Sequence, residues 1–406
     1  MWTLIGTSNF VQHTSNTTWL KKYWNSFQRG VNASLLKINH TSGLMVVDKK
    51  ADWQRCCQGG ENIAANALLF HVLRKGADMA ATLGDHNVVT LYSSLASMLA
   101  SAMNNILWDE NIGAFRDNPT SSLYPQDGNS LAVWFGVTKK YPNRSILISN
   151  YLHSNWGVHG AASPEWNNGT SIGTFPGSME VFSHFAAGEG KRALDLVRLQ
   201  WGYMLHSPIS TRSTFWEGYN IDGTFNFDGS YMSNAHGWGS GPGGAMTASV
   251  LGIRAEHYGS GGGGGGGSGG DDDVDLSSSS ELLHRSTPFV VAPQPSGLTW
   301  CTGSLSLNEK HTIHVQWNAT IDFFHLRLNL NHASKNARGR VELPLLLTKA
   351  GEEDDAIEIL VDGIVVATRS SVSLLPDSFS SSVVRYSMVV PTPLQSHVYV
   401  VRRRRS

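Results

Sequence analysis

Cysteine is scarce in this chain: there are 3 cysteines in 406 residues, with Cys56 next to Cys57 and Cys301 far from both. Three cysteines in this arrangement do not form a disulfide framework, and no Cys or His spacing is typical of a zinc site. The seven glycines at 261–267 are not followed by the Gly-Lys-Ser/Thr ending of a phosphate-binding loop. The sequence therefore predicts buried free thiols, no metal and no cofactor.

An excess of charge of one sign is also missing. The 31 Lys and Arg balance 32 Asp and Glu, and the formal net charge is -1. This balance excludes an electrostatic argument for a nucleic-acid partner. The local exception, Arg402 to Arg405, is interpreted as a solvated basic tail. No stretch approaches the roughly 18 continuous apolar residues of a membrane span, so no membrane partner is expected.

The first residues lack the basic region and apolar core of a signal peptide. Six Asn-X-Ser/Thr sequons are nevertheless present, more than we expect in a cytosolic chain of this length. They are Asn16, Asn32, Asn39, Asn143, Asn168 and Asn318. We therefore expect a secreted glycoprotein whose signal peptide is missing from this sequence. The oligomeric state cannot be inferred from the sequence.

Apolar residues recur at helical spacing through residues 1–255. Trp19, Trp24, Phe27 and Val31 mark one such stretch, and further stretches lie at 61–70, 91–103, 129–138, 143–153, 178–187 and 190–204. The connections between them are rich in Gly, Pro, Asn and Trp. Helices that alternate with long aromatic loops indicate helical hairpins of the (α/α) barrel type, although periodicity alone also allows another all-α array.

The composition changes sharply after residue 255. Residues 256–284 combine the glycine run with acidic and serine runs, which predicts a disordered linker. From 285 to 406 the apolar pattern has period two, as at 312–317 and 324–328, and Asp362-Gly363 predicts a hairpin turn within 357–366. The fold class is therefore mainly α, followed by a C-terminal antiparallel β-sandwich.

The strongest candidate for chemistry is Glu217, within the sequence TFWEGY at 214–219. Trp216 stands beside it, and His236 and Trp238 follow within SNAHGW at 233–238. Flat apolar rings, one carboxylate and one histidine are the groups needed to hold and cleave a sugar. Glu217 could act as a general base, with the aromatic side chains against the sugar ring. Alternatively, Glu217 is a solvated loop residue and His236 a structural histidine.

Other carboxylates stand beside aromatic residues. Asp52 could bind sugar hydroxyls while Trp53 stacks on a ring, or Asp52 could simply lie near a helix N-terminus. Asp127 could be a polar site residue or a helix N-cap, and the cap is slightly favoured. Glu165, before Trp166, and Glu180, after Met179, are weaker candidates of the same kind.

Several motifs in this order resemble the α-L-rhamnosidases of glycoside hydrolase family 78, particularly the fungal secreted ones. They are ADW at 51–53, QGGEN at 58–62, LWDE at 107–110, YPQDGN at 124–129, GKRALDL at 190–196, QWGYM at 200–204, TFWE at 214–217 and AHGWGSGP at 235–242. The resemblance covers residues 1–255 well and continues more weakly through VAPQ at 291–294 and GRVELP at 339–344.

The resemblance implies a six-hairpin (α/α)6 barrel and hydrolysis of terminal α-L-rhamnose from rhamnosides, with inversion. Its substrates would be rhamnose-containing glycosides or plant polysaccharide. Residue by residue, Glu217 matches the family's general base and His236 the histidine that lines the rhamnose pocket. Asp52 and Trp53 match a motif whose aromatic ring packs against the sugar.

One part of the family pattern is absent. The family's general acid comes from an acidic, Arg-containing motif on an early barrel segment, and residues 1–50 contain nothing of that form. By the family's order this motif would precede Met1, so we expect a truncated member with an incomplete barrel and little or no activity. The alternatives are a non-catalytic carbohydrate-binding remnant or inactive fragment, and an inverting (α/α) hydrolase that acts on another sugar.

Overall fold

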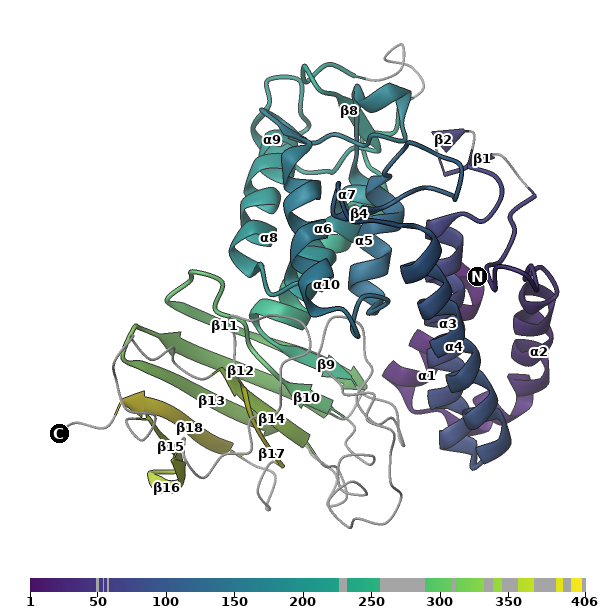
Figure 1. Ribbon diagram of the computed structural model, residues 1–406. Coiled ribbons are helices and arrows are strands. Elements are labelled where there is room, and N and C mark those ends of the chain that lie inside the picture. Colours follow the sequence, from purple (N-terminus) through teal and green to yellow (C-terminus); the bar gives the residue numbers. More distant parts are fainter. Residues whose placement is uncertain are drawn as a thin grey trace. The chain divides into compact units, whose positions relative to one another are not determined.

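The computed structural model describes residues 1–48, 51–53, 55–56, 58–225, 232–255, 289–308, 311–331, 339–344, 357–368, 385–389 and 396–403. The chain divides into two compact units (Figure 1). The first contains residues 1–8 and 18–245, and the second contains residues 9–17 and 246–406. The predicted linker at 256–284 and the last two arginines of the basic tail lie outside the described residues.

The first unit is helical, as the apolar spacing predicts. Its longer helices are α2 (Thr17–Leu35), α3 (Ile63–Leu83), α4 (His86–Ile106), α5 (Gln126–Phe135), α6 (Pro142–Ser154) and α7 (Thr174–Ala186). The stretch predicted at 190–204 forms α8 (Gly190–Leu196), a π-helical turn (Val197–Trp201) and α9 (Gly202–His206). Helix α10 (Gly241–Ala245) ends this unit, and α1 (Trp2–Thr14) is shared between the two units.

Helix α3 is an inner helix. Asn62 caps its first turn by accepting from the backbone N–H of Ala65, and Gly84 ends it with φ of +77°. Most of its residues are buried, whereas α4 buries only one side, through Tyr92, Ala96 and Leu99 among others. A Cβ at Gly76 would lie 2.8 Å from the Tyr92 ring, so this glycine lets α3 and α4 approach closely.

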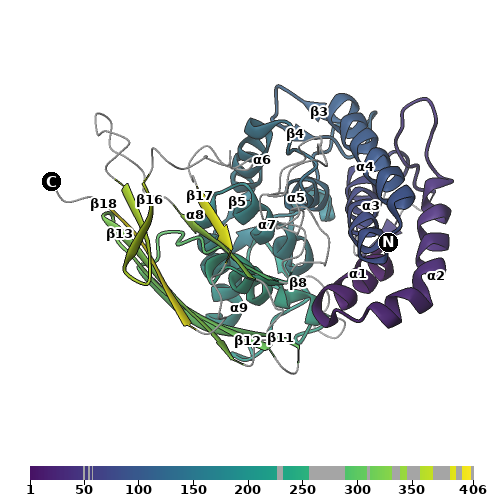
Figure 2. The same ribbon diagram turned by 90° about the horizontal axis from the view of Figure 1, so that it is seen from below.

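The inner helices follow one another in space as they do in sequence. Helix α3 packs against α4 and α5, α5 against α6 and α7, and α7 against α8 and α10. This arrangement can be followed in Figure 2, where α3, α5 and α7 form a row with α4 and α6 beside it. Such a row of paired helices brings the loops at one end of the inner helices into a common region.

Short two-residue and three-residue strands shape those loops. They pair as β1 (Ala51–Asp52) with β2 (Arg55–Cys56), β3 (Trp108–Asp109) with β4 (Ala114–Phe115), β5 (Trp156–Gly157) with β6 (Gly160–Ala161), and β7 (Ser171–Gly173) with β8 (Gly218–Asn220). Each pair pins a loop by backbone hydrogen bonds. The candidate residues at 52, 53 and 217 lie in or next to these pairs.

The second unit contains two sheets. One has the order β17-β14-β10-β9, from Arg385–Val389, Gly339–Pro344, Phe289–Val291 and Ile253–Ala255. The other has the order β11-β12-β13-β18-β15-β16, from Trp300–Asn308, His311–Ala319, Phe323–Asn331, Ser396–Arg403, Ile357–Val361 and Ile364–Thr368. The pairing is antiparallel except between β10 and β14, which is parallel.

The period-two pattern explains which face of the six-stranded sheet is buried. Along β12, Ile313, Val315 and Trp317 are buried, and their neighbours in between are more exposed. The turn at Asp362-Gly363 has φ of +50° and +84°, which joins β15 to β16 as the sequence predicts. Cys301 is a free thiol but is only half-buried, because β11 is an outer strand among those described; the prediction of a buried thiol is wrong at this position.

Candidate functional site

Glu217 is fixed by its backbone, directly before strand β8. The Thr174 hydroxyl, at the first residue of α7, donates to the carbonyl oxygens of Trp216 (2.7 Å) and Glu217 (3.0 Å). The neighbouring Trp216 is fully buried, with its ring edge-on to those of Tyr203 and Tyr219. The buried tryptophan therefore anchors the loop, and Glu217 itself is left near the surface.

His236 is brought to Glu217 by a second segment. The backbone N–H of Glu217 donates to the Ser233 carbonyl at 2.9 Å, and the N–H of His236 donates to the Phe215 carbonyl at 2.8 Å. The Glu217 carboxylate accepts from the Ser233 N–H at 3.2 Å, and His236 Nδ1 lies 3.8 Å from Glu217 Oε2. The two side chains are 15% and 28% exposed, so water and ligand can reach both of them.

Aromatic rings continue from His236 across the unit. Trp238 lies against His236 (centroids 4.1 Å apart) and stacks on Phe175 (5.1 Å, interplanar angle 16°). Phe175 also meets Trp53 edge-on at 6.3 Å, and Trp53 meets Trp166 at 5.7 Å. These rings, which we call the aromatic wall (Trp53, Trp166, Phe175 and Trp238), connect loops that are far apart in the sequence.

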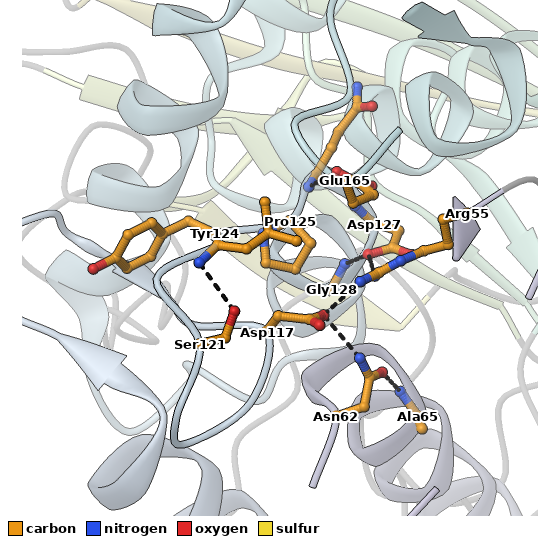
Figure 3. Close-up of polar contacts among 12 residues, drawn as sticks. Arg55, Asn62, Ala65, Asp117, Ser121, Tyr124, Pro125, Asp127, Gly128 and Glu165 are labelled. Carbon is orange, nitrogen blue, oxygen red and sulfur yellow. Dashed lines mark hydrogen bonds and ion pairs between the residues drawn. The ribbon is translucent and has the colours of Figure 1, made fainter. Parts of the chain in front are cut away.

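A buried polar network supports the Trp53 end of the wall (Figure 3). The indole N–H of Trp53 donates to Asp127 Oδ2 at 3.1 Å. Arg55, only 2% exposed, donates to both Asp127 oxygens (3.0 and 3.1 Å) and to Asp117 Oδ1 (2.8 Å), which also accepts from Asn62 Nδ2. Burial opposes the charge of Arg55, but the Asp127 and Asp117 carboxylates outweigh it and keep the Arg55 pKa above its usual value.

Glu165 belongs to the same network. Its two oxygens accept from the backbone N–H groups of Gln126 (2.8 Å) and Asp127 (2.9 Å), the first residues of α5. Burial, followed by the nearby Asp127 carboxylate, raises the pKa of Glu165 to about 8. The helix N-terminus favours the ionised form, whereas burial favours the protonated one. Glu165 is therefore a carboxyl group whose protonation can change near neutral pH.

Glu180 lies in a second buried group on α7. It accepts from Gln126 Nε2 and from the Trp156 indole, both at 2.6 Å, and His184 Nε2 lies 3.1 Å from it. The other ring nitrogen of His184 is 2.8 Å from the Ser149 hydroxyl. Gln126 is the first residue of α5 and directly precedes Asp127. Its side chain therefore links Glu180 to the start of α5.

The predicted site residues fall into two groups. Glu217, His236 and Trp238 form the first group. Trp53 and Asp127 form the second, joined by the hydrogen bond from the Trp53 indole to the Asp127 carboxylate. Asp52 is exposed and accepts from its neighbour's N–H, the backbone N–H of Trp53, at 2.8 Å. The N-cap prediction for Asp127 is wrong: Pro125 is at the cap position of α5, and Glu165 accepts from the first N–H groups instead.

Sequence reasoning missed Arg55, Asp117 and Phe175, and it gave Glu165 little weight. A signal was available only for Arg55, a single basic residue two positions after the Asp52-Trp53 motif. Within the described ranges no group of three or more His, Cys, Asp and Glu could hold a metal ion, and no helix there is long and apolar enough to cross a membrane. A surface depression of about 410 Å³ lies elsewhere, between α2 and α4, beside Arg29 and Tyr92.

No protein-family model matches the chain. Over 195 residues it is 25% identical to N,N'-diacetylchitobiose phosphorylase of Vibrio furnissii, a match that covers 40% of the chain and 24% of that protein.

Solved structures of two rhamnosidases share the fold. The rhamnosidase of family GH78 from Bacillus sp. GL1 matches with a TM-score of 0.56 and 22% identity, over 80% of this chain and 31% of that one. The α-L-rhamnosidase from Dictyoglumus thermophilum matches with a TM-score of 0.63 and 14% identity, over 97% of this chain and 38% of that one. The chain thus spans less than two-fifths of each of these proteins, and the likeness is one of fold.

Proposed function

We propose that the site is built for inverting hydrolysis of terminal α-L-rhamnose from glycosides, with Glu217 as the general base. The observation that supports this proposal most directly is the Glu217–His236 pair, which is partly exposed at the Trp238 end of the aromatic wall. The family-specific motifs around both residues and the shared fold support the sugar class. On this proposal the helical unit is part of an (α/α)6 barrel, and the protein is a secreted glycoprotein of the fungal type.

In this mechanism Glu217 takes a proton from a water molecule as the water attacks the anomeric carbon. The 3.2 Å hydrogen bond from the Ser233 N–H orients the carboxylate that would take this proton. His236, at 3.8 Å, lies close enough to bind a sugar hydroxyl or the same water. Trp53, held by Asp127, presents its ring to the sugar, and Asp52 and Trp238 border the bound sugar.

An inverting hydrolase also needs a general acid on the opposite side of the sugar. Glu165 has the raised pKa of such a group, but both its oxygens accept from the backbone of α5 and it is buried. Asp117 and Asp127 are engaged by Arg55. With no match to the family's acid motif in the sequence, we expect this chain to hydrolyse ordinary rhamnosides slowly or not at all.

Substrates with different leaving groups test both halves of this proposal. The dinitrophenolate group of a 2,4-dinitrophenyl α-L-rhamnoside leaves without protonation, so Glu217 alone should suffice for this substrate. An alkyl rhamnoside needs a general acid, and its hydrolysis should be about 10²- to 10⁴-fold slower than that by an enzyme with such an acid. Glu217→Gln should abolish hydrolysis of the activated substrate, and Asp195→Asn, an exposed change on α8, should leave it unaffected. The first product seen by proton NMR should be the β-anomer.

Equal rates for the parent and Glu217→Gln would refute the role of Glu217. Rapid hydrolysis of the alkyl rhamnoside would refute the missing acid. Rhamnose binding in calorimetry with no turnover of either substrate would identify a carbohydrate-binding remnant, and no binding at all would point to an inactive fragment. A panel of other activated sugars would reveal a different sugar specificity.

A second candidate reaction is phosphorolysis, and the 25% identity to a phosphorylase is the observation that favours it. A phosphorylase uses inorganic phosphate in place of water. Adding phosphate to the activated-substrate assay should therefore leave the rate unchanged if the proposal of hydrolysis is right. Formation of a sugar 1-phosphate would favour the alternative.

A further inference from the structure

Trp300 is an unusually exposed aromatic side chain. It begins β11, the outer strand of the six-stranded sheet among those described, and is 63% exposed. Its cross-strand partner on β12 is Asn318, and the partner of Asn318 on β13 is His325. Directly opposed residues project from the same face of an antiparallel sheet. Trp317, the residue before Asn318, is fully buried, so this row of three lies on the face away from the core.

Asn318 is also the acceptor residue of a sequon, Asn318-Ala319-Thr320. The sequon ends β12 and enters a tight turn, where the Thr320 N–H donates to the Phe323 carbonyl at 2.8 Å. The Thr320 hydroxyl accepts from the backbone N–H groups of Asp322 and Phe323, both at 3.2 Å. The sequon therefore lies at a hairpin end on an open sheet face.

The other sequons differ in their surroundings. Asn39 is engaged, because its amide donates to Glu61 Oε1 at 2.9 Å. Asn32 and Asn143 lie inside helices α2 and α6, Asn16 lies in the short connection between α1 and α2, and Asn168 lies in the 3-10 helix Asn167–Gly169. Only the Asn318 sequon, among the six, lies on a strand directly opposite an exposed tryptophan.

We propose that Asn318 carries an N-linked glycan whose first N-acetylglucosamine packs on the Trp300 ring. In the transfer, Asn318 Nδ2 forms a bond to the anomeric carbon of a lipid diphosphate-linked oligosaccharide. The bond from that carbon to the diphosphate oxygen breaks, Nδ2 loses a proton, and the lipid diphosphate leaves.

The attached sugar begins at a side chain whose Cβ lies roughly 4.5–5.5 Å from that of Trp300, within contact distance of the indole. It would cover an apolar ring that is largely exposed and would shield β11, the outer strand of this sheet among the described residues. The proposal rests on the proposed secretion but not on the proposed hydrolysis of rhamnosides, and its test measures no catalytic activity.

Occupancy is tested by secreting the full chain, with an added signal sequence, from yeast. Treatment with peptide N-glycosidase in ¹⁸O-water converts a glycosylated asparagine to labelled aspartate, which peptide mass spectrometry identifies. We expect the label at Asn318 and its loss in Asn318→Gln. Translation in the presence of microsomes gives the same result for a chain that yeast does not export. Unlabelled Asn318 overturns the proposal, whatever the other sequons carry.

Contact with Trp300 is tested by hydrogen exchange of the β11–β12 amides. Endoglycosidase trimming leaves one N-acetylglucosamine on Asn318, and this form is compared with Asn318→Gln. A sugar–indole contact of the size of an aromatic pair should slow exchange about 2- to 10-fold. The difference should persist in Trp300→Phe and vanish in Trp300→Thr, both of which suit an exposed strand position. An equal difference in Trp300→Thr overturns the contact.

Discussion

The helical unit holds its acidic side chains in two contrasting ways. In the network around Arg55, three carboxyl groups are buried, and each accepts two or more hydrogen bonds from fixed partners. Glu217 is partly exposed, and His236 Nδ1 lies 3.8 Å from its carboxylate. The first arrangement fixes the position of a group. The second leaves a carboxylate that solvent can reach, and on the proposed function support and chemistry therefore belong to different carboxylates.

The largest effect should come from removing Arg55. Arg55→Met leaves Asp117 and Asp127 buried without their cation, which should lower the free energy of unfolding by about 3–5 kcal/mol. Arg198→Met, which removes an exposed pair with Asp195, is the control and should cost about 0–1 kcal/mol. Urea denaturation followed by far-UV circular dichroism gives both values. Similar losses in the two variants would contradict the assignment of a supporting role to the network.

The next effect depends on pH. The pKa of Glu165 is raised above its unfolded value to about 8, so between roughly pH 5 and 8 the folded chain binds the extra proton. Stability from this group should therefore fall as the pH rises through that window, by at most about 1.4 kcal/mol per pH unit.

Glu165→Gln should flatten the dependence of the free energy of unfolding on pH, because glutamine does not titrate. Denaturation at pH 5, 6.5 and 8 measures the slope, and Asp195→Asn serves as the exposed control. A slope in Glu165→Gln equal to that of the parent would show that this carboxyl group is not the one that titrates.

A smaller effect is expected from Trp53→Phe, which keeps an aromatic ring but loses the indole N–H bond to Asp127. Since Arg55 still engages Asp127, the cost to stability should be about 1 kcal/mol. Rhamnose binding should weaken less in Trp53→Phe than in Trp53→Ala, because only the alanine variant removes the ring. Calorimetry measures both, and equal affinities in the two variants would exclude stacking by Trp53.

The smallest effect on stability is expected at the candidate base. Glu217→Gln should change the free energy of unfolding by less than about 1 kcal/mol, because the side chain is partly exposed and an amide oxygen can still accept from the Ser233 N–H. The same variant should lose all turnover of the activated rhamnoside. A large loss of stability would place Glu217 with the supporting groups.

Periodicity predicted most of the architecture. The spacing of Trp24, Phe27 and Val31 marks α2, and Asp362-Gly363 marks the β15–β16 turn, because both signals depend on neighbours in sequence. The parallel pairing of β10 with β14 could not be predicted in this way, because it joins segments separated by a long stretch of chain. The π-helical turn at Val197–Trp201 likewise interrupts a helix whose apolar spacing shows no break.

The candidate site shows the same division. Glu217 and His236 stand in distinctive local motifs, and the chain brings them together. Arg55 and Asp117 are 62 positions apart, and nothing in the local sequence of either residue marks the other as its partner. Glu165, beside Trp166, has the sequence context of a site carboxylate. In the structure it caps the first turn of α5, where the cap residue Pro125 offers no side-chain hydrogen bond. Long-range polar pairing leaves no periodic trace in the sequence.

The distant cap of α5 also bears on how the chain is made. Pro125 offers no side-chain hydrogen bond to the first turn of α5, and the carboxylate that fills this role is 38 and 39 residues further along the chain. During synthesis, α5 would therefore leave the ribosome with its first turn open to water. That turn would close only after residue 165 has emerged. The end of the unit that carries the candidate site would therefore mature later than α5 itself.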